Sequence, residues 1–251
     1  MSSTSPDDLR ALICDKYDGD AHAVTDDDRA RLTAGEPLAY VIGWIPFLGV
    51  TVHLDSHPLT PRPETEWWTE RLINTLRKRT KPFTFLDLCA GSGAIGLAVL
   101  KHLPNARVTF AEIDQDHVTL IQKNIEVNGL DESRATLHSG DLFAPLGTTR
   151  FDVIATNPPY VPEERALPKS VSAFEPYQAL RAGPDGLSVI KRIAEQAPQH
   201  LTTPGVLWLE CDTEHTQEAA VLIRRTTGAR TEVHADQFGR SRLVVAYYTH
   251  G

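Results

Sequence analysis

The sequence predicts an α/β fold, namely a doubly wound and mostly parallel sheet with a small N-terminal part of helices and a hairpin. From about residue 61 onward, short apolar runs alternate with helical patterns, which is typical of parallel strands joined by helices. One of these runs leads directly into a glycine-rich loop, and another ends at two consecutive prolines. The 251 residues are enough for one such core with a small addition.

Residues 1–59 form the predicted N-terminal part. Its helical patterns lie at residues 7–17 and 26–34. Alternating apolar residues then cover residues 40–54, and they predict a hairpin with turns at Gly43 and Gly49. This part therefore has its own few elements before the alternating strand and helix pattern begins.

The alternating region contains five predicted parallel strands and a final antiparallel pair. The parallel strands are expected near residues 84–88, 107–112, 135–139, 151–156 and 205–211. Two further apolar runs, residues 231–234 and 242–248, are separated by Gly239 and predict the pair that closes the sheet. Ligands of such sheets bind at the carboxyl ends of the parallel strands, so we expect the site residues directly after these strands.

The first strand is followed by a loop of small residues. This loop consists of Cys89, Ala90, Gly91, Ser92 and Gly93. Its glycines let the backbone approach a ligand closely, and the helix that follows offers free N–H groups at its positive end. The next strand ends at Glu112, nineteen residues after Gly93, where α/β nucleotide sites place an acid that accepts the ribose hydroxyls. The sequence therefore predicts a nucleotide-like ligand across this loop.

The nature of that ligand follows from what the loop lacks. The loop has neither the Lys-Ser/Thr pair of a phosphate-binding P-loop nor the complete glycine pattern of a dinucleotide site. A nucleoside without a phosphate chain fits better. S-adenosylmethionine is such a nucleoside, and its sulfonium methyl group is an electrophile.

The strand expected at residues 151–156 is followed by Asn157, Pro158, Pro159 and Tyr160. The two prolines stop both helix and sheet, so this turn is stiff. The Asn157 carboxamide and the Pro158 carbonyl can accept hydrogen bonds from an NH₂ group, and the Tyr160 ring can pack on a planar group. Alone, the tetrapeptide is equally typical of an ordinary turn. Together with the glycine loop and Glu112, it predicts a site that grips a planar amino group.

In this order, the motifs resemble those of the HemK-type protein-(glutamine-N5) methyltransferases, which in bacteria and organelles methylate the Gly-Gly-Gln loop of peptide-chain release factors. The similar blocks lie at residues 35–43, 60–66, 87–95, 141–143, 157–160, 174–187 and 239–245. The resemblance implies a Rossmann-like class I S-adenosylmethionine-dependent methyltransferase domain over residues 60–251. It also implies that residues 1–59 help to recognise the release factor, with a helical part shorter than the family usually has.

The resemblance further implies a role for each site residue. The cofactor-binding residues would be Cys89, Ala90, Gly91, Ser92, Gly93, Glu112, Asp141, Leu142 and Asn157. Asp141 and Leu142 would hold the adenine, and the catalytic residues would be Asn157, Pro158, Pro159 and Tyr160. An amide nitrogen is a poor nucleophile, so the expected contribution is positioning, without a metal ion or a strong general base.

Three features near the site have competing interpretations. Asp87 is expected to organise the loop, with a water or cofactor-amine contact as the less favoured role. Cys89 is expected to pack rather than to act as a nucleophile. Residues 61–66 are equally typical of a helix start and of a segment that borders the active-site mouth.

The net charge of −8 disfavours a nucleic-acid enzyme, because such enzymes usually present a basic face to phosphates. One short basic cluster consists of Arg71, Arg77, Lys78, Arg79 and Lys81, and it is typical of a solvated helix end. Direct nucleic-acid binding is therefore not expected. Three alternatives to glutamine methylation stay open. The protein methylates an exocyclic base amine, it methylates a small amide or guanidino metabolite, or it has lost catalysis and only binds a partner.

Cysteine usage and hydropathy indicate the compartment. Cys14, Cys89 and Cys211 lack metal-ligand spacing, so neither a metal site nor a disulfide framework is expected. No apolar stretch is long enough to span a bilayer, and residues 1–8 are polar and acidic, unlike a leader. We therefore expect a cytoplasmic protein without membrane contact.

Overall fold

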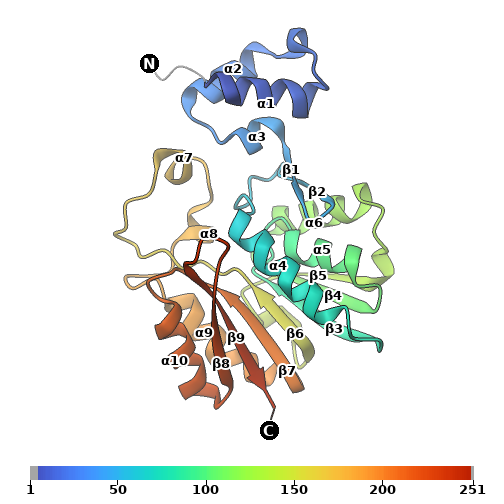
Figure 1. Cartoon of the computed structure of the whole chain (residues 1–251), viewed down its shortest axis with the longest axis vertical. Coiled ribbons are helices and arrows are strands. Elements are labelled where there is room, and N and C mark those ends of the chain that lie inside the picture. Colours follow the sequence, from blue (N-terminus) through green and yellow to red (C-terminus); the bar gives the residue numbers. More distant parts are fainter. Residues whose placement is uncertain (1–4, 250–251) are drawn as a thin grey trace.

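A computed structural model describes residues 5–249 of the chain. Half of the acidic start that argues against a leader, residues 1–4, lies outside the described residues, as do residues 250–251. The N-terminal helices form one end of an elongated molecule, and the sheet with its covering helices forms the other (Figure 1). Within residues 5–249, no helix is both long and apolar enough to cross a membrane.

The N-terminal helices pack around a small core of their own. They are α1 (Pro6–Tyr17), η1 (Ala21–Ala23), α2 (Asp26–Ala34) and α3 (Leu38–Ile42). Thr25 and Asp28 cap the start of α2 reciprocally, and Gly35 ends this helix in the left-handed conformation. The core between the helices is formed by Leu12, Leu32 and Val41. The two long helices agree with the predicted ranges.

The predicted hairpin over residues 40–54 is correct in its second part and wrong in its first. Residues 40–42 belong to α3, because one helical turn there buries Tyr40 and Val41. Gly43, expected as a hairpin turn, ends α3 at φ 94°, with its N–H donating to the carbonyl of Ala39. An apolar run of five residues fits either a helical or a strand period, and here burial favoured the helix.

The hairpin itself is anchored on the sheet domain. Its strands β1 (Trp44–Phe47) and β2 (Val50–His53) are antiparallel and join at Leu48 and Gly49, both with positive φ. The Asn128 carboxamide accepts from the backbone N–H of Thr51 at 2.8 Å and donates to its carbonyl at 2.7 Å. The hairpin also contributes buried side chains to the core of the sheet domain, namely Phe47, Val50 and Val52.

The central sheet has the strand order β5-β4-β3-β6-β7-β9-β8. The strands are β3 (Phe83–Leu88), β4 (Ala106–Glu112), β5 (Ala135–Ser139), β6 (Phe151–Thr156), β7 (Leu201–Glu210), β8 (Arg230–Ala235) and β9 (Ser241–Tyr248). The pairs from β5 to β7 are parallel, whereas β9 is antiparallel to both β7 and β8. The predicted mostly parallel sheet with a closing antiparallel pair is therefore confirmed.

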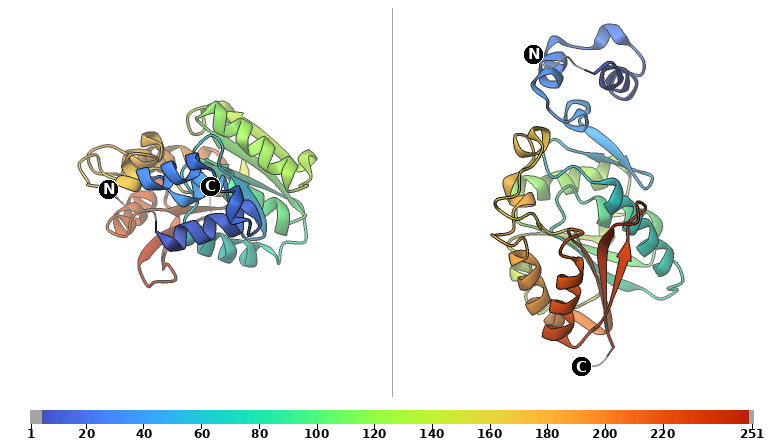
Figure 2. Two further views of the ribbon diagram at one scale, coloured as in Figure 1. Left: turned by 90° about the horizontal axis from the view of Figure 1, so that it is seen from above. Right: turned by 60° about the vertical axis from the view of Figure 1, so that its left-hand side comes forward.

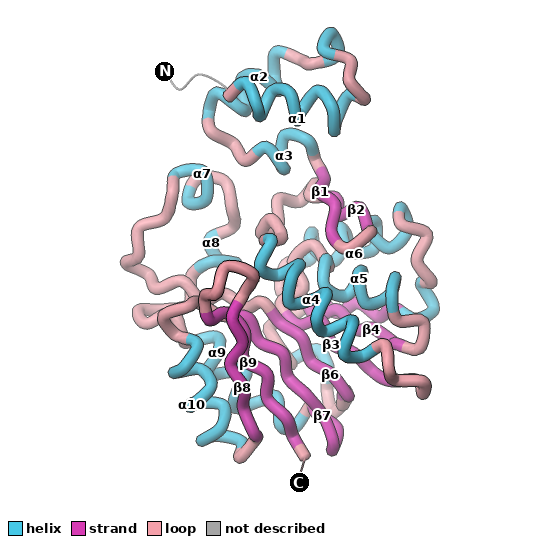
Figure 3. The backbone as a smooth tube through the Cα atoms, in the orientation of Figure 1, coloured by secondary structure: helices cyan, strands magenta, loops and turns pink. Residues whose placement is uncertain are grey.

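Helices cover both faces of this sheet (Figures 1 and 3). One face packs against α4 (Pro63–Leu76), α5 (Ala94–His102) and α6 (Gln115–Val127), and the other against α9 (Ser188–Gln196) and α10 (Thr216–Thr227). Alternate residues of each strand point to opposite faces, so Phe85 enters the first core and Leu86 the second. This two-sided cover is the predicted doubly wound arrangement.

The remaining short elements lie in the connections. They are η2 (Glu132–Arg134), η3 (Ala144–Leu146), α7 (Lys169–Ser172), α8 (Tyr177–Leu180) and η4 (Ala197–Gln199). The segment that carries α7 and α8 follows β6 and lies on the side of the sheet domain nearest the N-terminal helices (Figures 1 and 2).

Candidate functional site

A cavity of about 280 Å³ lies at the carboxyl ends of the parallel strands. Of the predicted site residues, seven line it: Cys89, Gly91, Glu112, Asp141, Leu142, Asn157 and Pro159. They lie at the end of a strand or shortly after it, on the four strands β3, β4, β5 and β6, and they meet because parallel strands end at the same edge of a sheet. The other predicted residues, which are Ala90, Ser92, Gly93, Pro158 and Tyr160, are not part of this lining.

The glycine loop turns sharply between β3 and α5. Gly91 and Gly93 have φ of 54° and 81°, in the region that favours glycine, and no heavy atom lies within 4 Å of where a Cβ of Gly91 would stand. Asp87 is fully buried behind the loop, and its Oδ2 accepts from the backbone N–H of Gly96 at 2.8 Å. Burial raises the pKa of Asp87 well above its ordinary value. This contact matches the loop-organising interpretation of Asp87.

Glu112 connects the glycine loop to the end of β4. Its Oε2 accepts from the backbone N–H of Gly91 at 2.8 Å, and its Oε1 accepts from the N–H of Asp114 at 3.0 Å. The residue is only 7% exposed, yet it lines the cavity. The backbone therefore holds the carboxylate in a fixed position, with lone pairs left for a ligand.

The loop after β5 contributes an apolar and a charged side chain. Leu142 has a positive φ of 50° and is buried in the core, while Asp141 is half exposed. The Arg192 guanidinium donates to Asp141 Oδ2 at 2.6 Å and also lines the cavity. Arg192 had no signal in the sequence, because it lies within α9, far along the chain from this loop.

Cys89 contributes a thiol to the lining of the cavity. Burial raises the pKa of Cys89 far above its ordinary value, so the thiol stays protonated at neutral pH. A protonated thiol is a weak nucleophile, and the packing role is the one that the structure supports.

The turn after β6 presents the Asn157 carboxamide to the cavity. Its Nδ2 donates to the hydroxyl of Thr65 at 3.2 Å, whereas its buried Oδ1 has no hydrogen-bond donor among residues 5–249. Tyr160 donates from its hydroxyl to Glu210 at 3.3 Å. An oriented acceptor without a partner suits a ligand that brings its own N–H group.

Comparison with known proteins agrees with this geometry. The sequence model of the protein family called Methyltransferase small domain matches residues 66–174. The release factor glutamine methyltransferase of Geobacter sulfurreducens is 36% identical over 217 residues, which cover 86% of this chain and 74% of that protein. The Streptococcus pneumoniae enzyme of the same name is also 36% identical, over 86% of this chain and 76% of its own.

The chain belongs to the HemK-type glutamine methyltransferase family. The resemblance inferred from the sequence motifs is thereby confirmed. The ribosomal protein uL3 glutamine methyltransferase of Bradyrhizobium diazoefficiens is 39% identical over 189 residues, which cover 72% of this chain. The chain spans 59% of the length of that relative, against about three quarters of the two release factor enzymes.

Solved structures support the methyltransferase fold. A T. thermophilus 16S rRNA N2 G1207 methyltransferase, solved with AdoMet and guanosine, matches with a TM-score of 0.58 and 24% identity over 81% of this chain and 49% of its own. The ribosomal protein L11 methylase of Lactobacillus delbrueckii matches with a TM-score of 0.55 and 17% identity, over 78% of this chain and 83% of that chain. The Rossmann-like class I fold is therefore confirmed.

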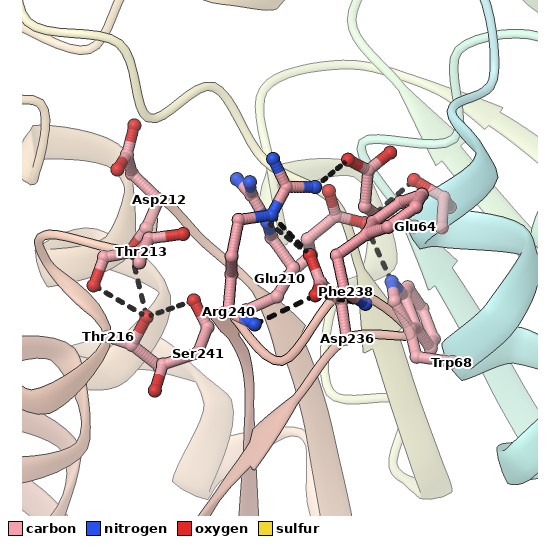
Figure 4. A network of polar contacts seen from close by, with 12 residues as sticks. Glu64, Trp68, Glu210, Asp212, Thr213, Thr216, Asp236, Phe238, Arg240 and Ser241 are labelled. Atoms are coloured by element: carbon pink, nitrogen blue, oxygen red, sulfur yellow. Dashed lines mark hydrogen bonds and ion pairs between the residues drawn. The ribbon is translucent and has the colours of Figure 1, made fainter.

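In this glutamine methyltransferase family member, sequence reasoning missed one almost fully buried acidic side chain beside the site. Glu210 ends β7 and is 1% exposed. Its Oε2 accepts from the Thr65 hydroxyl at 2.7 Å and from the Trp68 indole N–H at 2.6 Å, and Figure 4 shows the indole pointing at this carboxylate. A signal was present, because Glu210 is the one acid in an otherwise apolar strand end.

Residues 61–66 contain the start of α4, and their polar side chains contact residues beside the site. Arg62 precedes α4 and donates to Glu175 at 2.6 Å. The other polar side chains of the segment contact four further parts of the chain. Glu64 accepts from Arg240 (Figure 4), Thr65 contacts Asn157 and Glu210, and Glu66 accepts from the backbone of Leu48. The helix-start interpretation is therefore confirmed, whereas none of residues 61–66 lines the cavity.

The segment after α8 supports the Asn157 turn from behind. The backbone N–H of Val161 donates to Leu180 at 2.8 Å, and that of Ala182 donates to Val161 at 3.0 Å. Gly186 has φ +71°, and a Cβ on it would lie 2.5 Å from the Tyr160 carbonyl oxygen. The block of residues 174–187 thus fixes the backbone that follows the turn.

Proposed function

We propose that this protein transfers the methyl group of S-adenosylmethionine to the side-chain nitrogen of a protein glutamine. The observation that carries the proposal is the Asn157 carboxamide at the cavity wall, whose oxygen lacks a donor within residues 5–249. A glutamine amide is planar and brings two N–H donors. Such a group completes the hydrogen bonding of Asn157 when it enters the cavity.

The cavity residues fit an adenosyl cofactor. Glu112 offers fixed carboxylate oxygens for two ribose hydroxyls, and Gly91 leaves open space beside them. Asp141 and Leu142 offer a polar contact and an apolar surface for an adenine. The small residues of the glycine loop, which are Cys89, Ala90, Gly91, Ser92 and Gly93, would adjoin the ribose and the methionine part. When bound, S-adenosylmethionine supplies an electrophilic methyl group on its sulfonium.

The protein side chains would act on the acceptor by orientation. Asn157 Oδ1 and the Pro158 carbonyl accept the two amide protons, Pro159 keeps the turn stiff, and Tyr160 packs beside the amide. These hydrogen bonds favour the state in which the nitrogen lone pair is localised, and they hold it toward the methyl group. The new C–N bond forms as the C–S bond breaks, and the nitrogen then releases one proton to solvent. Neither a metal ion nor a strong general base takes part.

The acceptor that we propose is the Gly-Gly-Gln loop of a peptide-chain release factor. Support comes from the release factor glutamine methyltransferases, of which the chain covers about three quarters. In this proposal residues 60–251 form the methyltransferase domain, and residues 1–59 recognise the release factor in the cytoplasm. The second candidate acceptor is ribosomal protein uL3, because a uL3 glutamine methyltransferase is 39% identical to this chain.

An acceptor panel tests the proposal. The purified protein is incubated with methyl-labelled S-adenosylmethionine and, separately, with release factor, release factor carrying Gln→Ala in its Gly-Gly-Gln loop, uL3, total RNA and a metabolite extract. We expect label on release factor that disappears with the Gln→Ala change. Label on uL3 alone would move the acceptor to the second candidate, and label confined to RNA or metabolites would refute glutamine methylation.

A further inference from the structure

The Asn157 side chain poses a problem of orientation that rests on the proposed function. A carboxamide can present either its oxygen or its NH₂ group to a ligand, and the two are similar in size. Only the oxygen can accept a hydrogen bond from a glutamine amide. If the NH₂ group faced the cavity, two donors would meet and the acceptor would be repelled. The activity therefore requires a neighbour that decides which way the Asn157 carboxamide points.

Thr65 is that neighbour, and its hydrogen bonds allow only one orientation of the Asn157 carboxamide. A hydroxyl has a single proton, and the proton of Thr65 is donated to Glu210 Oε2 at 2.7 Å. Toward Asn157, at 3.2 Å, the Thr65 oxygen can then only accept. The Asn157 NH₂ group must therefore face Thr65, and its oxygen must lie on the other side of the carboxamide, where it has no donor among residues 5–249.

Glu210 in turn is held as an acceptor by Trp68. The indole N–H can only donate, and it lies 2.6 Å from the same Oε2 atom that receives the Thr65 proton. Trp68 is completely buried and Glu210 is 1% exposed, so water does not compete for these contacts. The second oxygen of Glu210 accepts from the Tyr160 hydroxyl at 3.3 Å. The Glu210 carboxylate thus binds the Tyr160 side chain directly and is linked to the Asn157 side chain through Thr65.

We propose that Thr65 and Glu210 are positioning residues of this methyltransferase: through a chain of hydrogen bonds from Trp68 to Asn157, they point the Asn157 carboxamide oxygen at the acceptor amide. These hydrogen bonds join α4, the end of β7 and the turn after β6. Neither residue lines the cavity, so neither touches cofactor or acceptor. Their effect is on the rate of methyl transfer and not on cofactor binding.

Hydroxyl removal at Thr65 is the first test. Thr65→Val keeps the shape of the side chain but removes the acceptor for the Asn157 NH₂ group. We expect kcat on the glutamine acceptor to fall by about 10- to 100-fold, since removal of one oriented hydrogen bond in a catalytic site costs up to this range. The Kd for S-adenosylmethionine should stay within about twofold of wild type, a difference of less than about 0.5 kcal/mol. Thr65→Ser restores the hydroxyl and should restore the rate.

The matched control is Thr69→Val. Thr69 lies one turn further along α4, is equally buried, and donates to the backbone carbonyl of Thr65 without contacting Asn157 or Glu210. The control loses a buried hydroxyl of the same helix but should keep the wild-type kcat. An equal loss of kcat in Thr65→Val and Thr69→Val would overturn the proposal, because the effect would then come from the helix alone.

Glu210→Gln separates positioning from proton transfer and gives a second route if Thr65→Val does not fold. The glutamine oxygen can take the place of Oε2 and accept from Trp68 and Thr65, while its NH₂ group faces Tyr160. We expect most of the activity to remain in Glu210→Gln and to be lost in Glu210→Leu. A Glu210→Gln variant as inactive as Glu210→Leu would contradict a role in orientation.

An NMR measurement without any acceptor tests the orientation even if the glutamine activity is absent. The side-chain NH₂ signals of Asn157 are identified by their loss in Asn157→Ala. In wild type and Thr65→Ser they should be protected from hydrogen exchange, and in Thr65→Val they should shift and exchange at least tenfold faster. Unchanged Asn157 signals in Thr65→Val would overturn the inference, whereas a wild-type enzyme that methylates no glutamine would refute only the proposed function.

Discussion

Replacing Glu112 with glutamine should weaken S-adenosylmethionine binding by about 10- to 100-fold. The Glu112 carboxylate accepts from the backbone N–H groups of Gly91 and Asp114, one on each oxygen. In Glu112→Gln, one oxygen becomes an NH₂ group, so one of these N–H groups meets a donor and the end of the loop shifts. An NH₂ group also cannot accept from a ribose hydroxyl. A hydrogen bond to a charged group contributes about 1.5–3 kcal/mol, so the loss of one such bond to the ribose corresponds to this range of Kd.

Isothermal titration calorimetry with S-adenosylmethionine measures the effect directly. The control is Glu126→Gln, an exposed position on α6 with the same chemical change, whose Kd should match wild type. Thermal unfolding without cofactor shows whether Glu112→Gln is still folded. An unchanged Kd in a folded Glu112→Gln protein would refute the assignment of Glu112 to the ribose hydroxyls.

Three further predictions concern the acceptor turn, its support and the N-terminal helices. Asn157→Ala should bind S-adenosylmethionine with wild-type Kd and lose about 100- to 1,000-fold of its methyl transfer rate, measured by calorimetry and label transfer; a wild-type rate would contradict the role of the carboxamide. Gly186→Ala should lower the free energy of unfolding by about 1–3 kcal/mol in urea titrations, because a Cβ at φ +71° would meet the Tyr160 carbonyl oxygen at 2.5 Å. An unchanged unfolding midpoint would count against this contact. Burial raises the pKa of Asp28, but hydrogen bonds from Lys16, Tyr17 and Thr25 outweigh it and leave this pKa well below its ordinary value. The resulting stability is present above about pH 4 and is lost as the pH falls further. Asp28→Asn cannot titrate, so its free energy of unfolding at pH 7 should be lower than that of wild type by about 3 kcal/mol. Below pH 4 it should lose less additional stability than wild type does. Parallel pH dependence of the two proteins would refute the contribution of the ion pair.

The sequence predicted those parts of the fold whose signals are local. The range of α2 and that of β6 agree with the structure to the residue, since a helical pattern marks the first and a short apolar run the second. β7 was predicted to begin at residue 205 but begins at Leu201. Its first half contains Pro204, which cannot donate a ladder hydrogen bond, and the register shifts between Phe151 and Val153 of the neighbouring β6.

The site was predictable where its residues follow strands directly, and not where contacts join distant segments. Glu112 and Asn157 come one residue or less from the end of their strands, so strand positions alone bring them together. Two partners of Glu210, Trp68 and Thr65, are 142 and 145 residues away in the sequence. Arg62 and Glu175 are likewise separated by 113 residues, and nothing in either segment indicates the other. Such pairs depend on how α4 packs against the sheet, which no local pattern specifies.

The most direct test of the account identifies the atom that receives the methyl group. Release factor methylated by the wild-type protein with labelled S-adenosylmethionine is hydrolysed in acid, and the volatile products are separated. A methyl group on the glutamine side-chain nitrogen is released as methylamine when the amide hydrolyses. We predict labelled methylamine from release factor with an intact Gly-Gly-Gln loop and none from the Gln→Ala variant. Label that resists hydrolysis, or that is released as methanol, would contradict methylation of a glutamine amide.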